Sequence, residues 1–180
     1  MRLTLHITKT TMLPLVLLLW GTMVISQDKF PIPTGNTKQL FYLQRTSNTN
    51  TIVYELNYKN GELDAEDPVH VFWIRYGEKG QREELSFIQR KFAYGIKSNL
   101  ISKDKYKLNF VSYKKYAMYL MKGADNKFGV YALINQKHVI LERIFVKING
   151  GSLFSPNIEY VELKGIDPAT GKEILEKMKI

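Results

Sequence analysis

A recurring pattern of short β-rich runs separated by turn residues is the feature that most limits the fold of this chain. Its first example spans residues 40–58, where two runs of aromatic and aliphatic residues flank six small polar residues at 46–51. Aromatic and β-branched residues favour strands, whereas Asn and Ser favour turns. The stretch from Leu40 to Tyr58 is therefore predicted to form a β-hairpin, with Arg45 at a strand position.

The strongest predicted strand spans residues 69–76. Side chains alternate between the two faces of a strand, so Val71 and Trp73 share one face and Phe72 and Ile74 share the other. Both faces are apolar, which is typical of a strand that is buried on both sides in a barrel or sandwich.

The rest of the body repeats this pattern, with one interruption. Further strands are predicted at 92–96, 106–111, 116–121, 127–134, 139–148, 158–164 and 173–178. One short helix is predicted near residues 82–91, because Leu85, Ile88 and Phe92 follow helical spacing and would pack as a stripe against a sheet. The fold class expected is mainly β, an antiparallel barrel or sandwich of roughly nine or ten strands with this one helix.

The amino-terminal residues 1–26 are predicted to be a secretory signal peptide. Arg2 and Lys9 precede an apolar run at 12–25, which is shorter than the roughly 20 residues that a membrane-spanning helix needs. A retained single-pass anchor is the alternative. The expected organisation is thus a signal peptide followed by one β-rich domain at 27–180, with no transmembrane span in the mature chain.

The absence of cysteine narrows the chemistry and the location. A chain without Cys forms no disulfide, no thiolate metal site and no bacterial acyl anchor. Together with the predicted signal peptide, this favours a secreted or periplasmic protein that is not a lipoprotein.

The strongly basic composition bears on possible partners. The net charge is +9, from 26 basic and 17 acidic residues. Such a surface can simply keep the protein soluble, or it can attract an anionic small molecule, a lipid headgroup or a polysaccharide. No long basic block or nucleic-acid motif occurs, so nucleic acid is not an expected partner.

The residues available for catalysis are few. Only His70 and His138 remain after the predicted leader, and neither belongs to a metal-binding pair or a nucleophile motif. The acidic loop at 63–68 lacks the ligand ladder of a calcium-binding loop. No catalytic residue, metal or cofactor is predicted.

The arginines give the clearest hint of a site. Arg45, Arg75 and Arg143 lie inside apolar strand runs, whereas lysines occupy the polar loops. A guanidinium tolerates partial burial when its donors are satisfied by a carboxylate or phosphate. Two interpretations follow. Each arginine pairs with a carboxylate such as Glu55, Glu142, Glu159 or Glu162, or several converge on a concave site for an anionic or hydroxyl-rich ligand.

Several motifs resemble those of the domain-of-unknown-function family 4833. They lie at residues 30–33, 41–45, 50–55, 73–76, 80–82, 92–95 and 160–162, so the likeness covers nearly all of the chain after the predicted leader. The resemblance implies an exported domain of the bacterial type, with uncharacterised activity and no catalytic residue to transfer. The motifs and the buried arginines together supply the candidate ligand-binding residues Gln44, Arg45, Trp73, Arg75, Gln81, Arg82, Tyr94 and Arg143.

Three functions remain open on the sequence alone. The first is a non-catalytic binding module for an anionic or hydroxyl-rich ligand. The second is a structural or interaction protein of the cell envelope, and the third is an enzyme of unrecognised type that would use Glu55, Arg75 and His138.

Overall fold

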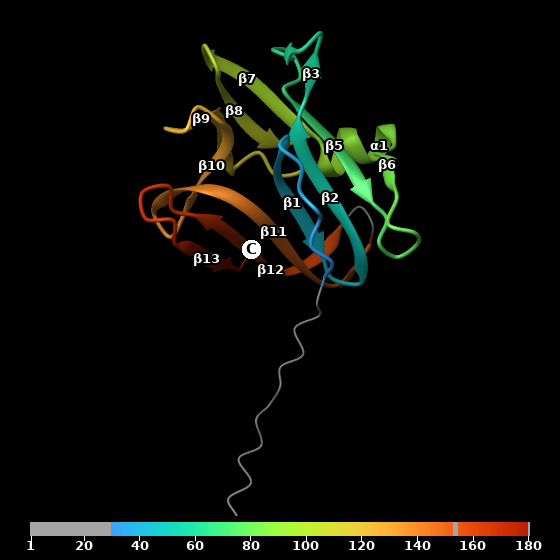
Figure 1. Ribbon diagram of the computed structural model, residues 1–180. Coiled ribbons are helices and arrows are strands. Elements are labelled where there is room, and N and C mark those ends of the chain that lie inside the picture. Colours follow the sequence, from blue (N-terminus) through green and yellow to red (C-terminus); the bar gives the residue numbers. More distant parts are fainter. Residues whose placement is uncertain (1–29, 153–154, 180) are drawn as a thin grey trace, which may run out of the picture.

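The computed structural model describes residues 30–152 and 155–179 (Figure 1). The predicted signal peptide therefore lies outside the described residues. The elements in chain order are β1 (Gln39–Arg45), β2 (Asn48–Leu56), β3 (Tyr58–Lys59), β4 (Glu62–Leu63), β5 (Val69–Ile74), β6 (Arg82–Glu84), α1 (Phe87–Gln89), the π-helix η1 (Arg90–Tyr94), β7 (Ile96–Ser102), β8 (Lys105–Phe110), β9 (Ala117–Lys122), β10 (Phe128–Ile134), β11 (Lys137–Gly151), β12 (Pro156–Ile166) and β13 (Glu173–Met178). Neither described helix has the length and apolar character needed to cross a bilayer.

Eleven of these strands form one strongly curled sheet. Its order is β6-β5-β2-β1-β11-β10-β9-β8-β7, with β12 and then β13 added beside β11. The curl gives a half-barrel, in which β1, β2 and β5 lie across from β7 to β10 (Figure 1). The predicted mainly β, barrel- or sandwich-like fold is confirmed, but the sheet is mixed because β1 pairs with β11 in parallel.

The long strand β11 connects the two halves of the sheet. Its first residues, 137–140, pair with β10, and its later residues, 143–146, pair with β1. Strand β12 pairs with residues 140–151 of β11 and so occupies the opposite edge. Strands β10 and β1 therefore share one edge of β11 and separate between Ile140 and Arg143.

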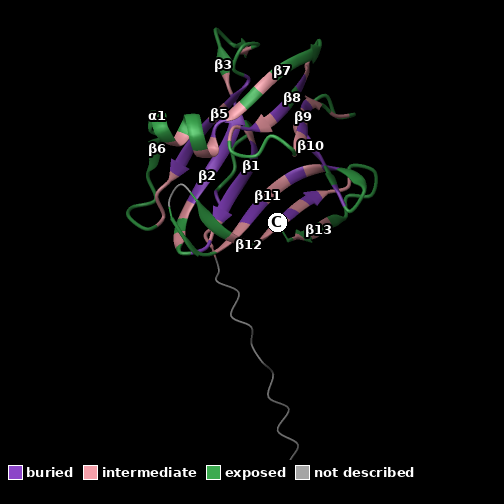
Figure 2. Ribbon diagram, turned by 180° about the vertical axis from the view of Figure 1, so that it is seen from behind, coloured by how far each residue is buried: buried purple, intermediate pink, exposed green. Residues whose placement is uncertain are grey.

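The main core lies between the two halves of the sheet. Phe41 of β1 stacks on Tyr54 of β2 at 4.3 Å between ring centroids, and Phe110 of β8 meets both rings edge-on. Figure 2 shows the buried residues concentrated on these strands. A second, smaller cluster on the outer face contains Tyr42, Val53 and Phe72. The two clusters confirm that β5 is buried on both sides.

The hairpin predicted within residues 40–58 is present, with a tighter turn than the sequence suggested. The first turn consists of Thr46 and Ser47 alone, and Ser47 adopts a positive φ of 63°. The remaining polar residues, 48–51, belong to β2, in which Asn48 pairs with β1 and Thr51 pairs with β5. The hairpin between β10 and β11 turns at Asn135 and Gln136, in the gap between the strands predicted at 127–134 and 139–148.

The single helical segment starts later than the sequence predicted. Residues 82–84 instead form β6, which pairs with β5. Residues 92–94, where a strand was expected, belong to η1, and β7 begins only at Ile96. Ser86 caps the amino terminus of α1, so the helix begins at Phe87. Leu85 is buried, but Ile88 and Phe92 are 56% and 59% exposed, and the predicted packing of that stripe is wrong.

Candidate functional site

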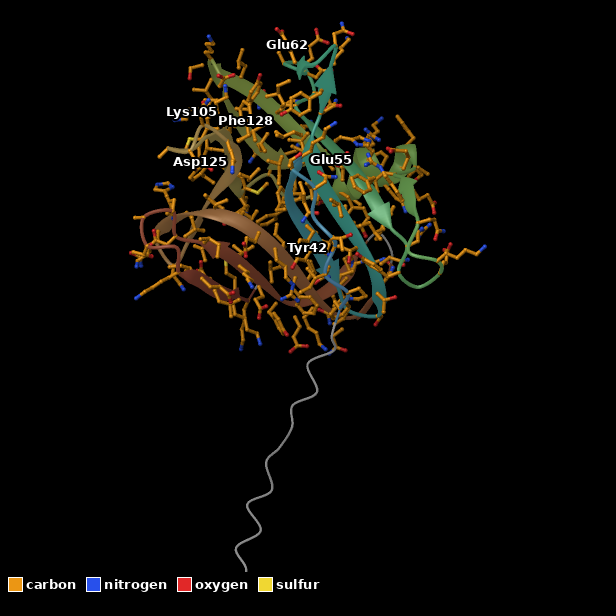
Figure 3. The ribbon with its side chains drawn as sticks, viewed as in Figure 1. Tyr42, Glu55, Glu62, Lys105, Asp125 and Phe128 are labelled. Atoms are coloured by element: carbon orange, nitrogen blue, oxygen red, sulfur yellow. The ribbon has the colours of Figure 1, made fainter. Side chains whose placement is uncertain are left out.

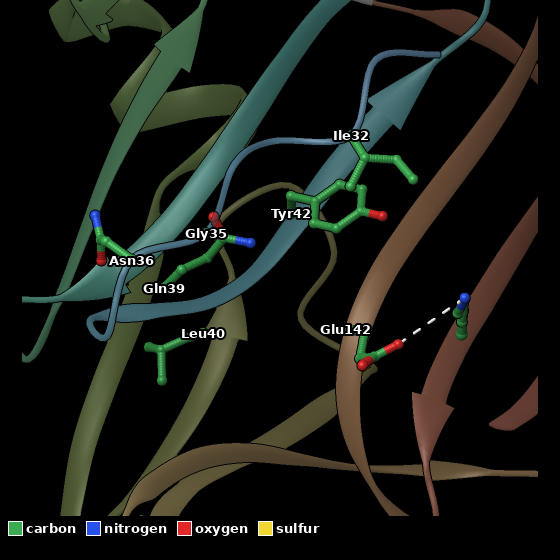
Figure 4. Close-up of a pocket in the computed structure, with 8 residues that line it drawn as sticks. Ile32, Gly35, Asn36, Gln39, Leu40, Tyr42 and Glu142 are labelled. Atoms are coloured by element: carbon green, nitrogen blue, oxygen red, sulfur yellow. Dashed lines mark ion pairs between the residues drawn. The ribbon is translucent and has the colours of Figure 1, made fainter. Parts of the chain in front are cut away.

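A cavity of about 400 Å³ opens on the outer face of the sheet where β1 and β10 separate (Figure 4). We call it the fork pocket. It is lined by Ile32, Gly35, Asn36, Gln39, Leu40, Tyr42, Glu142 and Lys164. Its volume lies within the range of about 300–1,000 Å³ that is usual for small-molecule sites.

Two irregularities in strand pairing shape this pocket. The pairing of β1 with β2 shifts between Gln39 and Phe41, and that of β11 with β12 shifts between Leu141 and Arg143. Each shift marks a β-bulge, in which one extra residue changes the direction of nearby side chains. Glu142 is the extra residue in β11, and it lines the fork pocket while Leu141 remains in the core.

The segment before β1 forms one wall of the fork pocket. The carbonyl of Pro31 accepts a hydrogen bond from Gln44 Nε2 at 2.8 Å, and the carbonyl of Ile32 accepts one from the Tyr76 hydroxyl at 3.4 Å. The ring of Phe30 packs on Phe145 at 5.2 Å between centroids. This segment, which precedes β1 and belongs to no helix or strand, lies across the outer face of the sheet.

The fork pocket contains charges of both signs. Lys164 Nζ lies 4.0 Å from a carboxylate oxygen of Glu142, and it also pairs with Glu173. The hydrogen bond to Glu173 raises the pKa of Lys164 above its usual value. Burial raises the pKa of Tyr42, so its phenol remains a neutral donor and acceptor at physiological pH.

A network of charged residues adjoins the pocket through Asn36. Asn36 Nδ2 lies 3.4 Å from Glu55 Oε2, and Arg82 Nη2 donates to Glu55 Oε1 at 2.8 Å. Figure 3 shows Tyr42 and Glu55 on the neighbouring strands β1 and β2. Burial raises the pKa of Glu55, but hydrogen bonds from Arg82, His70 and Asn36 outweigh burial and hold the pKa below its usual value.

His70 occupies the centre of this network. His70 Nδ1 lies 3.3 Å from Glu55 Oε1 and 2.8 Å from Arg82 Nη2. The other ring nitrogen, Nε2, lies 2.8 Å from Glu84 Oε2. His70 of β5 therefore links Glu55 of β2 to Arg82 and Glu84 of β6.

Residues 41–177 match a family model described as a domain of unknown function, DUF4833. The chain belongs to this family. The family resemblance expected from the sequence motifs is thus confirmed. Neither a curated protein nor a solved structure matches the chain. The match begins within β1 and ends within β13, so Tyr42, Glu142 and Lys164 belong to the DUF4833 domain, whereas the wall at residues 30–36 precedes it.

Two of the candidate residues predicted from the sequence lie beside the fork pocket. Arg143 Nε donates to Gln44 Oε1 at 2.9 Å, and Arg143 Nη1 lies 3.3 Å from Glu162 Oε1. Gln44 follows Tyr42 on the same face of β1, and Arg143 follows Glu142 in β11. The DUF4833 domain therefore brings Gln44 and Arg143 together at the edge of the pocket.

Another group of candidates lies near the helical segment. The rings of Trp73 and Tyr94 meet edge-on at 5.2 Å, and the guanidinium of Arg75 lies 5.5 Å from the Trp73 ring. Arg75 also makes a two-pronged pair with Glu83 at 2.7 and 3.0 Å. Trp73 belongs to the opposite face of β5 from Phe72, and Arg75 follows the strand with its guanidinium beside the Trp73 ring, so this group is separated from the fork pocket by the sheet.

The remaining candidates occupy three different surroundings. Gln81 donates to Glu78 in the loop before β6, and Arg82 belongs to the network around Glu55. Arg45 is half-buried, and its Nε has no hydrogen-bond partner in the part of the chain that the structure describes. The eight candidates thus lie on both faces of the sheet, and their role in ligand binding stays a prediction.

Sequence reasoning missed the residues of the fork pocket itself. Glu142 was considered only as a partner for an arginine, Tyr42 lay within the 41–45 motif but was not chosen as a candidate, and Lys164 belonged to no motif. One signal was present in β11, where Glu142 and Arg143 separate the apolar residues Leu141 and Ile144. Two successive polar residues break the period-2 alternation, and such a break is typical of a bulge.

Proposed function

We propose that the DUF4833 domain is a non-catalytic binding module, secreted or periplasmic, that holds a hydroxyl-rich ligand such as a saccharide in the fork pocket. The observation that carries this proposal is the bulge in β11, which directs the carboxylate of Glu142 into a cavity opposite Lys164. Bulges of this kind often place a side chain next to a functional site.

The polar groups of the pocket suit hydroxyl groups better than an anion. Glu142 would repel an anionic ligand, and the charge of Lys164 is already balanced by Glu142 and Glu173. Asn36 and Gln39 add amide groups that both donate and accept hydrogen bonds. A ring of hydroxyls can use carboxylate, ammonium, amide and phenol groups at once.

The same arrangement supports binding rather than proton transfer. General acid–base chemistry uses a pair of groups whose pKa values are driven apart toward the working pH. In the fork pocket, the pKa of Lys164 is raised by its carboxylate partner and the pKa of Tyr42 is raised by burial. Both shifts move these two groups further from titration near neutral pH.

Saturation-transfer NMR on the purified protein tests this proposal. A panel of neutral mono- and oligosaccharides and linear polyols is compared with a panel of phosphates and carboxylates. We expect signal transfer to neutral, hydroxyl-rich compounds. We also expect Glu142→Gln to weaken their binding about tenfold, because a hydrogen bond to a charged group is replaced by one to a neutral group.

Two matched variants control for general effects of charge. Glu159 of β12 and Lys107 of β8 are exposed and lie outside the pocket lining, so Glu159→Gln and Lys107→Met should leave binding unchanged. Lys164→Met should weaken binding. Selective binding of anions, or neutral binding that is equally strong in Glu142→Gln, would contradict the proposed function.

A further inference from the structure

An exposed apolar surface on the helical segment is the feature least explained by the half-barrel. Phe87, Ile88 and Phe92 are 72%, 56% and 59% exposed, and neither α1 nor η1 contains a buried residue. Figure 2 shows α1 exposed at the side of the sheet. Single exposed apolar residues are common on protein surfaces, but three within one short helical segment call for an explanation. We call Phe87, Ile88, Lys91 and Phe92 the apolar ledge.

The helical segment is fixed to the sheet by contacts other than the apolar ledge. Gln89 Oε1 accepts hydrogen bonds from the Ser86 backbone at 3.0 Å and from Trp73 Nε1 at 3.3 Å. The carbonyl of Tyr94 accepts a hydrogen bond from the buried Tyr54 hydroxyl at 3.0 Å. The side chain of Gln89, the Tyr94 carbonyl and the Tyr94 ring, which packs on Trp73, thus attach the segment, while Phe87, Ile88 and Phe92 remain exposed.

The widened turn of η1 gathers the two phenylalanines around one lysine. Lys91 Nζ lies 5.3 Å from the Phe87 ring centroid and 5.4 Å from the Phe92 centroid. Residues five apart lie on different sides of an α-helix, at about 140° to each other, but a π-turn brings them closer together. Short π segments recur at functional sites.

Gly95 allows this turn to close. A Cβ atom at position 95 would stand 2.0 Å from the Arg90 carbonyl oxygen, so a larger residue would force the backbone to move. The sequence therefore contains a specific residue that preserves the π-turn. The helical segment is therefore a defined part of the fold and not a frayed helix end.

We propose that the apolar ledge docks the domain on an anionic lipid surface, with Phe87, Ile88 and Phe92 entering the interfacial layer and Lys91 meeting lipid phosphates. Aromatic and aliphatic side chains beside basic ones are the combination that binds the membrane interface. Lys91 has no carboxylate partner among the ion pairs of the described residues, and the chain as a whole carries a net charge of +9. A lipid layer accepts such a projecting surface without a groove of matching shape.

The experiment uses the lack of native cysteine, which makes single-site labelling straightforward. Ile88→Cys carries an environment-sensitive fluorophore on the apolar ledge, and Ile101→Cys carries the same fluorophore on β7, where Ile101 is 52% exposed. Each labelled full-length protein is mixed with vesicles of phosphatidylcholine alone or of phosphatidylcholine and phosphatidylglycerol. We expect a blue shift at position 88 with the anionic vesicles and none at position 101.

The comparison within one chain separates the apolar ledge from any other membrane-binding segment. Equal shifts at both positions, or no shift at position 88, would overturn the proposal. A shift at position 88 that depends on protein concentration without vesicles would also overturn it, and would assign the surface to a second copy of the chain.

A charge variant tests the role of the lysine independently. Lys91→Gln should weaken binding to the anionic vesicles about fivefold, because each basic residue near such a surface adds to the attraction. Lys107→Gln, which removes an exposed lysine of β8, is the matched control and should have little effect. Equal binding of Lys91→Gln and the unmodified protein would refute the proposed contact with phosphates.

Discussion

Replacing Arg82 with methionine should destabilise the domain by about 2 kcal/mol at neutral pH, because a buried carboxylate then loses its guanidinium partner. The side chain of Glu55 is only 8% exposed, and Arg82 Nη2 donates to it at 2.8 Å. Methionine keeps much of the packing of the Arg82 side chain over Phe72 but removes the charge. In a domain of this size, such a loss lowers the melting temperature by about 4–8 °C.

The pH dependence of this effect follows from the lowered pKa of Glu55. A carboxyl group whose pKa is lower in the folded state stabilises the fold above its unfolded-state pKa, and this stabilisation is lost as the pH falls through the folded-state pKa. Removing Arg82 removes one cause of that lowering. The difference in stability between the two proteins should thus be largest near neutral pH and shrink below about pH 4.

Urea denaturation followed by circular dichroism at several pH values measures this difference. Arg75→Met is the matched control, because Arg75 pairs with Glu83, whose side chain is 47% exposed, and its loss should cost less. A cost of Arg82→Met that is the same in a Glu55→Gln background would refute the reasoning, since the two groups would then be uncoupled.

Three further predictions concern the core, the π-turn and the tyrosines. Leu120→Ala should destabilise by about 2–5 kcal/mol in urea denaturation, because Leu120 is fully buried, whereas Leu133→Ala should cost far less because Leu133 is 49% exposed. Gly95→Ala should destabilise by about 1–3 kcal/mol in the same assay, since its Cβ would meet the Arg90 carbonyl, and an unchanged midpoint would contradict that close approach. Burial raises the pKa of Tyr54 well above 10, whereas tyrosine in the unfolded chain ionises near pH 10, so the free energy of unfolding should fall as the pH rises past about 10. The ultraviolet absorbance of tyrosinate should then rise together with unfolding. Ionisation of every tyrosine without unfolding would disprove this.

The local pattern of the sequence was sufficient for most of the strands. The alternation in β5 and the break between the strands predicted at 127–134 and 139–148 both agree with the structure, because strand periodicity and turn chemistry act over a few residues. Strand β6 was missed because Arg82, Glu83 and Glu84 have little intrinsic preference for a strand. Their conformation is set by pairing with β5.

Long-range pairing was beyond the reach of local patterns. The parallel contact of β1 with β11 places Gln44 opposite Phe145, and no feature of either segment by itself specifies that partner. The fork pocket depends on this contact, so its residues could not be grouped from the sequence. The burial of arginines within β-structure was predicted more successfully, since the side chains of Arg75 and Arg143 are only 25% and 24% exposed.

The bulge at Glu142 also determines which side chains of β11 face the core on either side of it. Before it, Leu141 points into the core, and after it Ile144 does so again, three positions later instead of two or four. Deleting one residue here would shift the alternation of side chains in one part of β11, either the part that pairs with β10 or the part that pairs with β1. In that part, the side chains that face the core would face outward, and the outward side chains would face the core. Members of the family should therefore tolerate changes in length at exposed turns such as the one at Lys103 and Asp104, and keep the spacing within β11 constant.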